Sequence, residues 1–289
     1  MTGSARSVSR DAPAKLNVFL RVLGAREDGY HELESLVAFA DFGDVLTLRT
    51  DAAEGLEIKG PFGGKSGPVG ENLVLKAVAA GRERVAGLRA GNFLLEKNIP
   101  VAAGLGGGSA DAAAALRLVA RANALALDDP RLMSAARATG ADVPVCLHPQ
   151  ARIMRGIGER LSAPIALPVL SAVLVNPLVP LATRDVFGKF AVRPNGDNHD
   201  DAVPKEFNPL IEFLQQHNND LADAACACAP VIGEILESLR ALPGARLVRM
   251  SGSGPTCFAL FATPNESTAA AQKLQAERPD WWIQPAAIG

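Results

Sequence analysis

A glycine-dense turn that runs directly into an alanine-rich segment constrains this chain more than any other feature. The stretch 99–116 reads Ile-Pro-Val-Ala-Ala-Gly-Leu-Gly-Gly-Gly-Ser-Ala-Asp-Ala-Ala-Ala-Ala-Leu. Its four glycines lack a Cβ atom, so their backbone can adopt positive φ and approach a ligand closely. We expect a helix over about 110–119, capped by Ser109, whose first-turn amides and dipole favour an anion. The pattern predicts a phosphate cradle, and a plain surface turn before a helix is the alternative.

The general phosphate-binding motifs do not fit this turn. The chain contains no G-x-x-x-x-G-K-[ST] sequence, and the residue three positions beyond Gly106 is Ser109, which breaks the G-x-G-x-x-G pattern. The segment 60–66 resembles a Walker loop, but only three residues separate its outer glycines and no compelling apolar strand precedes it. We therefore predict a surface loop over 60–66.

Composition limits the classes of protein that this chain can represent. At 289 residues it can form two modest domains, and a proline-rich transition suggests a boundary that leaves domains over 1–160 and 161–289. The net charge of −2 argues against a broad nucleic-acid surface. No apolar run is long enough for a membrane span, and the four scattered cysteines suit free thiols. We expect a cytoplasmic protein, a monomer or homodimer, that binds neither nucleic acid nor membrane.

The order of the predicted elements indicates an α+β fold. Alternating polarity predicts a half-buried strand over 14–22, and two further strands over 36–39 and 45–48 are separated by a predicted turn. Helical spacing follows Asn72, which is a plausible N-cap. Later strands are expected over 93–95, around 153, and over 169–175, 247–250 and 256–262, and later helices over 130–138, 184–190, 209–216, 230–242 and 266–276.

Two charged residues are candidates for chemistry. Lys15 and Asn17 project from one face of the first strand, where the lysine is either a solvated edge residue or a desolvated ammonium with an anionic partner. Asp142 precedes a Val-Pro sequence, so it is either a helix N-cap or a general base that deprotonates or orients a hydroxyl. If Asp142 is the base, Lys15 would keep its carboxylate ionised.

Two further segments could contact a ligand. The turn at 28–31 holds Tyr30, the only tyrosine of the chain, which could stack on a planar base while His31 reads the edge of that base. A packed aromatic in an ordinary turn is the alternative. The segment 250–256 is a second glycine turn between strands, at which backbone amides could reach a ligand.

Together these segments resemble the GHMP small-molecule kinases. Residues 12–17, 100–113 and 250–254 resemble the first, second and third motifs of that family, in the family's order and from end to end of the chain. The resemblance implies a two-domain GHMP kinase fold, with a ribosomal-S5-like N-terminal domain, a C-terminal GHMP domain and an active site in the cleft between them. The element around Tyr30 and His31 is similar to the branch that acts on a cytidyl substrate.

The resemblance also implies a role for each matched residue. ATP would phosphorylate the 2-hydroxyl of 4-diphosphocytidyl-2-C-methyl-D-erythritol, an intermediate of the non-mevalonate isoprenoid pathway, with Asp142 as the base and Lys15 as its electrostatic partner. The residues that would bind ATP are Asn72, Lys97, Pro100, Gly104, Leu105, Gly106, Gly107, Gly108 and Ser109. The residues that would bind the cytidyl substrate are Asn17, Tyr30, His31, Asp142, Thr183 and Phe187.

The sequence departs from the family pattern at two positions and leaves other functions open. Ser35 stands where relatives often have threonine, which is a tolerable change. Ala110 stands where many relatives have a second serine, so one hydroxyl near the phosphates is missing. No acidic residue is an obvious Mg²⁺ ligand, and we expect the phosphates and water to hold that ion. Alternatives are another GHMP kinase of the mevalonate, homoserine or sugar type and a non-catalytic nucleotide-binding protein; a Rossmann oxidoreductase is disfavoured because regular βαβ alternation is missing.

Overall fold

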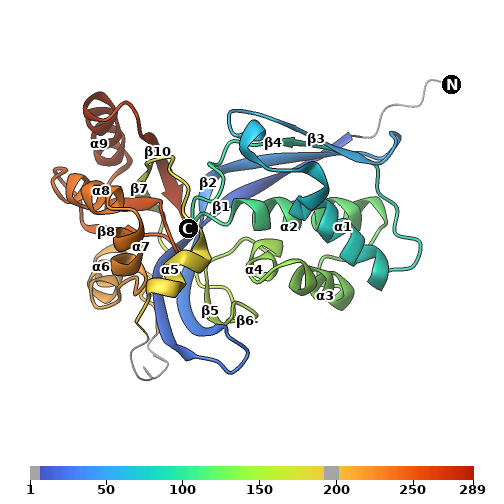
Figure 1. The fold of residues 1–289 in the computed structure, drawn as a ribbon, viewed down its shortest axis with the longest axis horizontal. Coiled ribbons are helices and arrows are strands. Elements are labelled where there is room, and N and C mark those ends of the chain that lie inside the picture. The colour runs from blue at the N-terminus through green and yellow to red at the C-terminus, as the bar shows by residue number, and fades with distance from the viewer. Residues whose placement is uncertain (1–6, 192–201) are drawn as a thin grey trace. The chain divides into compact units, whose positions relative to one another are not determined.

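The computed structural model describes residues 7–191 and 202–289, which form helices and mainly antiparallel strands (Figure 1). This confirms the α+β prediction. The chain divides into two compact units, of which the first comprises Met1–Ala14, Phe42–Val101 and Gly106–Pro149, and the second Lys15–Asp41, Ala102–Leu105 and Gln150–Gly289. Two long strands, β1 (Ser7–Ala25) and β2 (His31–Arg49), contribute to both units. The division into domains over 1–160 and 161–289 stays a prediction.

Both long strands depart from what their sequences predict. Residues 36–39 and 45–48 belong to one continuous strand, and no turn separates them. Gly43 makes this possible, because a Cβ atom there would lie 2.2 Å from the main-chain oxygen of Ala12. The segment 14–20 of β1 is buried on both faces, so the prediction of a half-buried strand is wrong.

In the described residues, the first unit contains four α-helices and a set of paired strands. Strand β4 (Asn92–Glu96) pairs antiparallel with the end of β2, with Val45 opposite Glu96, and parallel with β3 (Gly55–Lys59). The sequence did not predict β3, because only Leu56 of its side chains is buried. The 3-10 helices and α-helices of the first unit are η1 (Gly63–Lys65), η2 (Val69–Glu71), α1 (Leu73–Arg84), α2 (Gly107–Ala122), α3 (Pro130–Thr139) and α4 (Val143–Leu147).

Helix α2 lies at the centre of the first unit. Residues 110–120 of this helix are all buried, and the helix contacts α1, α3 and α4. The small side chains of its alanine run let neighbouring helices approach closely, as the sequence predicts. The predicted helix boundary is wrong by three residues at the start, because the α-helix begins at Gly107.

The second unit is built on an antiparallel sheet. Strand β7 (Leu170–Asn176) pairs with β10 (Trp282–Ile288) on one side and β9 (Cys257–Phe261) on the other, and β8 (Leu247–Met250) pairs with β9. β5 (Arg152–Gly156) pairs with the first half of β2 and with β6 (Arg160–Leu161). The helices of this unit are α5 (Thr183–Lys189), α6 (Phe207–Gln215), α7 (Ala222–Cys228), α8 (Val231–Arg240) and α9 (Pro264–Glu277).

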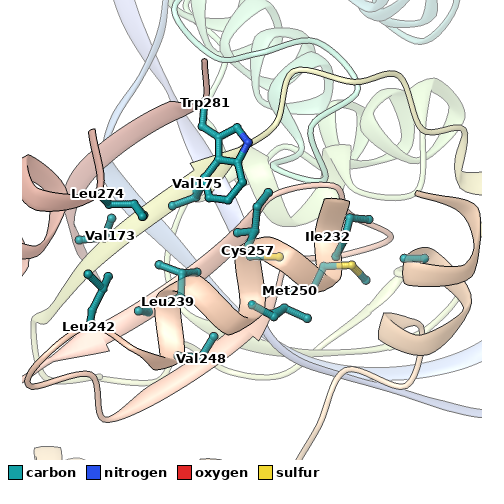
Figure 2. Close-up of a cluster of buried hydrophobic side chains, with 14 of the residues drawn as sticks. Val173, Val175, Ile232, Leu239, Leu242, Val248, Met250, Cys257, Leu274 and Trp281 are labelled. Atoms are coloured by element: carbon teal, nitrogen blue, oxygen red, sulfur yellow. The ribbon is translucent and has the colours of Figure 1, made fainter. Parts of the chain in front are cut away.

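Figure 2 shows part of the hydrophobic core of the second unit. Val173 and Val175 from β7 and Met250 and Cys257 from neighbouring strands pack with side chains of α8 and with Trp281. Burial raises the pKa of the Cys257 thiol, so this cysteine is an inert core residue. The core supports β8 and β9, the strands that flank the second glycine turn.

Candidate active site

Three of the sequence motifs meet within the second unit. The main-chain nitrogen of Lys15 donates to the oxygen of Leu105 at 2.9 Å, which joins β1 to the first glycine turn. The buried hydroxyl of Ser251 accepts a hydrogen bond from the nitrogen of Asn17 at 3.1 Å and donates to the oxygen of Gly104 at 2.9 Å. One serine side chain therefore links β1, the first glycine turn and the second glycine turn.

The glycines at this junction are required by the backbone. Gly104, Gly106 and Gly252 have φ values of 72°, 60° and 57°. A Cβ atom on Gly104 would lie 2.6 Å from the oxygen of Ser251, closer than side chains tolerate. Gly107 and Gly108 instead have helical backbone, so only part of the predicted positive-φ run exists.

The start of α2 differs from the predicted capping arrangement. The N-cap is Gly106, which has no side chain, and Ser109 occupies the third position of the helix. The prediction that Ser109 caps the helix is therefore wrong. Because no side chain caps α2, its first-turn amides keep the capacity to bind an anion, and the dipole of a 16-residue helix favours negative charge there.

Lys15 and Asn17 form the start of a buried polar chain in the second unit. The ammonium of Lys15, which is 3% exposed, donates to Oδ1 of Asn17 at 3.1 Å. Nδ2 of Asn17 donates to the hydroxyl of Ser35 at 2.7 Å, and this hydroxyl donates to the oxygen of Phe19. The interpretation of Lys15 as a solvated edge residue is wrong. These bonds fix the orientation of both side chains.

Asp142 stands at the N-terminal end of α4 in the first unit. It occupies the N-cap position, yet its side chain makes no capping hydrogen bond. Its main-chain oxygen accepts a hydrogen bond from the nitrogen of Cys146 at 3.3 Å, so the backbone of Asp142 is part of the helical turn. The carboxylate is thus not used as a helix cap, and its pairing with Lys15 stays a prediction.

Lys97 lies in a buried charge cluster that sequence reasoning missed. Its ammonium donates to Oδ2 of Asp44 and, at 2.8 Å, to Oδ2 of Asp111. Oδ1 of Asp44 accepts from the nitrogens of Asn98 and Ile99 at 2.5 and 2.8 Å. All three charged residues are at most 5% exposed. The signal in the sequence was weak, since Asp44 lies at the end of a predicted turn and Asp111 lies in the alanine-rich helix.

This cluster has one carboxylate more than its single ammonium can neutralise. The pKa of Asp111 is raised to about 7, because burial raises it most, the charge of Lys97 lowers it and the Asp44 carboxylate raises it. Among the described residues, Oδ1 of Asp111 has no hydrogen-bond partner. A Cβ atom on Gly107 would lie 3.1 Å from the Lys97 ammonium, which places the cluster directly below the first turn of α2.

The remaining nucleotide-site candidates lie in the first unit. Asn72 caps α1, because its Oδ1 accepts from the nitrogen of Val74 at 2.9 Å, as the sequence predicts. Pro100 is buried just after the Lys97 segment. The loop 60–66 is largely exposed and contains the short turn η1, which agrees with the predicted surface loop.

Four of the six acceptor-site candidates, Tyr30, His31, Thr183 and Phe187, belong to the second unit and lie on or near α5. The ring of His31 stacks on Phe187, with centroids 4.7 Å apart and an interplanar angle of 29°. Thr183, one turn earlier on α5, pairs its hydroxyl with Ser253 of the second glycine turn at 2.8 Å. Tyr30 is 59% exposed beside His31. Helix α5 thus connects the tyrosine-histidine turn with the second glycine turn.

Family models match both parts of the chain. The model of the GHMP kinases N terminal domain matches residues 72–150, and the model of the GHMP kinases C terminal domain matches residues 202–280. A protein of Xanthobacter autotrophicus named 4-diphosphocytidyl-2-C-methyl-D-erythritol kinase is 53% identical, over 95% of this chain and 96% of its own. The chain belongs to the GHMP kinases.

Further relatives of this GHMP kinase agree with that assignment. A Rhodopseudomonas palustris protein named 4-diphosphocytidyl-2-C-methyl-D-erythritol kinase is 52% identical over 99% of both chains. A crystal structure of 4-(cytidine 5'-diphospho)-2C-methyl-D-erythritol kinase superposes with a TM-score of 0.79 at 36% identity, covering 98% of this chain and 99% of that one. Homoserine kinase from Cytophaga hutchinsonii shares the fold, with a TM-score of 0.68 at 19% identity over 99% and 97% of the two chains.

The family membership makes this chain an ATP-dependent phosphotransferase with the two-domain GHMP kinase fold. It also places the glycine turn and α2 inside the segment matched by the N-terminal family model. Within the described residues, no helix combines the length and apolar character that crossing a membrane requires.

Proposed function

We propose that this kinase transfers the γ-phosphoryl group of ATP to the 2-hydroxyl of 4-diphosphocytidyl-2-C-methyl-D-erythritol. The proposal rests on one observation. Proteins named as kinases of that compound are 50–53% identical in sequence to this chain over nearly its full length. The related crystal structure with the same substrate in its name supports it. With its four free cysteines, we expect the enzyme to work in the reducing cytoplasm.

The aromatic residues near α5 support a cytidine-binding role. Tyr30 presents an exposed ring next to His31, and His31 already stacks on Phe187. Exposed aromatic faces bind planar bases by stacking, and ring nitrogens or backbone groups read the base edge. In our proposal Tyr30 stacks on cytosine, His31 reads its edge, and Phe187 and Thr183 complete the pocket.

On the donor side, the glycine turn binds the phosphates of ATP. Backbone amides of residues 104–109 point at the phosphate oxygens, and the dipole of α2 adds to the attraction. Asn72 and the segment at Lys97 and Pro100 hold the adenine. The ammonium of Lys97 donates its hydrogen bonds to Asp44 and Asp111. In our proposal Lys97 therefore holds the adenine-binding segment in place and does not itself contact the nucleotide.

The chemical step needs little more than positioning and charge stabilisation. Asp142 accepts the proton of the acceptor hydroxyl, and Lys15 keeps the carboxylate of Asp142 ionised and stabilises the transferred phosphoryl group. Asn17, fixed by its bonds to Lys15 and Ser35, contacts the acceptor.

We propose that the ATP phosphates hold Mg²⁺, with water completing its coordination. No cluster of three His, Cys, Asp or Glu ligands occurs in the described part of the chain, and Mg²⁺ commonly keeps several waters. Bound there, Mg²⁺ would neutralise charge on the transferring group.

The decisive experiment measures ADP release by the purified enzyme with ATP, Mg²⁺ and one acceptor at a time. We expect turnover with 4-diphosphocytidyl-2-C-methyl-D-erythritol and none above background with mevalonate, homoserine or galactose. Phosphorus NMR of the product should show a new phosphomonoester beside the intact diphosphate. Turnover with one of the other acceptors but not with the cytidyl compound would refute the proposed substrate and leave the kinase family intact.

A further inference from the structure

Arg117 is a buried guanidinium in the middle of α2 whose hydrogen-bond acceptors are all main-chain carbonyls. It is 8% exposed, and its Nη1 donates to the oxygen of Cys146 at 2.6 Å, with a longer bond of 3.4 Å to Leu147. Nη2 donates to the oxygen of Asp11 on β1 at 2.7 Å. None of the ion pairs found among the described residues involves Arg117. Burial lowers the pKa of Arg117, because removing the charged guanidinium from water costs free energy.

The carbonyls that Arg117 binds are those of the C-terminal end of α4. This helix has only five residues, too few to hold its geometry by backbone hydrogen bonding alone. The last carbonyls of a helix carry partial negative charge and lack partners within the helix. Arg117 supplies both the donors and the positive charge, and therefore fixes the C-terminal end of α4 to α2.

The other end of α4 carries Asp142. Asp142 is the N-cap of α4, and its main-chain oxygen accepts a hydrogen bond from the nitrogen of Cys146, so the backbone of Asp142 moves with α4. Helix α2, which holds α4 through Arg117, itself begins at the glycine turn, with Gly106 as N-cap. One rigid helix thus connects the proposed phosphate-binding turn with the anchor of the proposed base.

We propose that Arg117 is a positioning residue for phosphoryl transfer, which sets Asp142, through α4, relative to residues 106–109 of the phosphate-binding turn. The inference rests on the role of Asp142 in the proposed function. Reacting groups must be held to within a fraction of an ångström, so a small shift of α4 lowers the rate of the chemical step more than it lowers substrate binding. A lysine cannot replace this function, because one ammonium does not reproduce the fork that spans Cys146 and Asp11.

The test is a double-mutant cycle of Arg117→Lys and Asp142→Asn, measured with whichever acceptor the wild-type enzyme phosphorylates. We expect Arg117→Lys to lower kcat by about tenfold or more, with KM for ATP changed by less than about twofold. In the Asp142→Asn background the same substitution should have almost no further effect on kcat. A purely structural arginine would lower kcat by the same factor in both backgrounds, and that result would overturn the proposal.

A matched control comes from the far end of the same helix. Asn123 binds the oxygens of Arg89 and Val119 at 2.7 and 2.8 Å, so Asn123→Ala also removes side-chain-to-backbone bonds that stabilise α2. We expect it to lower the thermal midpoint and to leave kcat unchanged. An equal loss of kcat in this variant would show that Arg117 acts through general stability.

Amide hydrogen exchange tests the same proposal without an activity assay, and so applies even if Arg117→Lys is inactive. Amide hydrogen exchange over residues 143–147 should be faster in Arg117→Lys than in the wild type, whereas Asn123→Ala should leave these amides unchanged. Unchanged protection of α4 in Arg117→Lys would overturn the proposal. A failure of the proposed function would be seen in a different measurement: the wild-type enzyme would not phosphorylate the cytidyl compound.

Discussion

Ser251 donates a hydrogen bond to the main-chain oxygen of Gly104 across 2.9 Å and so joins two glycine turns that lie 147 residues apart in the chain. The same hydroxyl accepts from the nitrogen of Asn17, and no part of Ser251 is exposed. A buried hydroxyl with two main-chain partners fixes both of them, since neither partner could turn to water if it were lost.

Replacing this serine should therefore weaken both the fold and the activity. Ser251→Ala leaves the nitrogen of Asn17 and the oxygen of Gly104 without a partner, and we expect the free energy of unfolding to fall by about 2 kcal/mol in urea denaturation. Ser253→Ala is the matched control from the same turn, because its hydroxyl is paired with Thr183 in an exposed position. An equal loss of stability in the two variants would contradict the bridging role of Ser251.

Asp142 should matter for the chemical step and not for the stability of α4. Asp142→Asn preserves the size of the side chain but removes the base, so we expect kcat to fall by about a hundredfold or more, with a small change in KM for ATP. Asp129 is the contrasting N-cap, since its side chain accepts from the nitrogen of Arg131 at 2.9 Å. Asp129→Ala should lower the thermal midpoint and keep kcat. An unchanged kcat in Asp142→Asn would remove this residue from the base role.

Asp111 should make stability depend on pH in a direction opposite to that of most carboxylates. Its folded pKa of about 7 lies above the ordinary value of 3.8, so the folded state binds more protons between these values. Stability from this group is complete below about pH 4 and is lost as pH rises to about 7, with a slope of at most about 1.4 kcal/mol per pH unit. The neutral Asp111→Asn should therefore gain stability relative to the wild type across this window, as measured by denaturation at several pH values.

A suitable control for this titration is Asp129→Asn. Hydrogen bonds from Arg131 lower the pKa of Asp129 to about 2, so its stability contribution changes only below pH 4. The difference between this variant and the wild type should be flat from pH 5 to 8. If the difference between Asp111→Asn and the wild type were equally flat, the raised pKa of Asp111 would be refuted.

Tyr30 and His31 should determine the affinity for the acceptor. The double substitution Tyr30→Ala and His31→Ala removes the proposed stacking face and edge contact, and we expect KM for the cytidyl acceptor to rise about tenfold or more, with KM for ATP unchanged. Val169→Ala, which shortens another exposed apolar side chain of the second unit, should change neither constant. Unchanged acceptor affinity in the double variant would favour a purely structural turn at this position.

Much of the fold was predictable because local signals agreed with packing. The helix after Asn72, the alanine-rich helix and the strands on both sides of the second glycine turn follow hydrophobic periodicity and capping rules. The misses have specific causes. Strand β2 continues through a segment that looks like a turn, because Gly43 lets the backbone of β1 approach, and β10 carries a proline that masks its strand character.

The candidate site was predictable only in part, because several of its contacts depend on residues far apart in sequence. The motifs pointed to Lys15, Asn17 and the glycine turns. They did not reveal that Lys97 is neutralised by Asp44 and Asp111, since nothing local indicates that three distant charges share one buried position. The role of Arg117 was also not predictable from the sequence. Its hydrogen-bond acceptors are main-chain oxygens of distant residues, and no sequence pattern indicates such contacts.

The sequence by itself determined the family, the position of the first glycine turn and the residue types available for chemistry, because each of these depends on short-range order along the chain. The tertiary structure alone decided which of those residues are buried, which charges neutralise one another and which hydroxyl joins the two glycine turns. Burial and charge pairing depend on the folded surroundings of a side chain, and those surroundings come from segments that the sequence keeps apart.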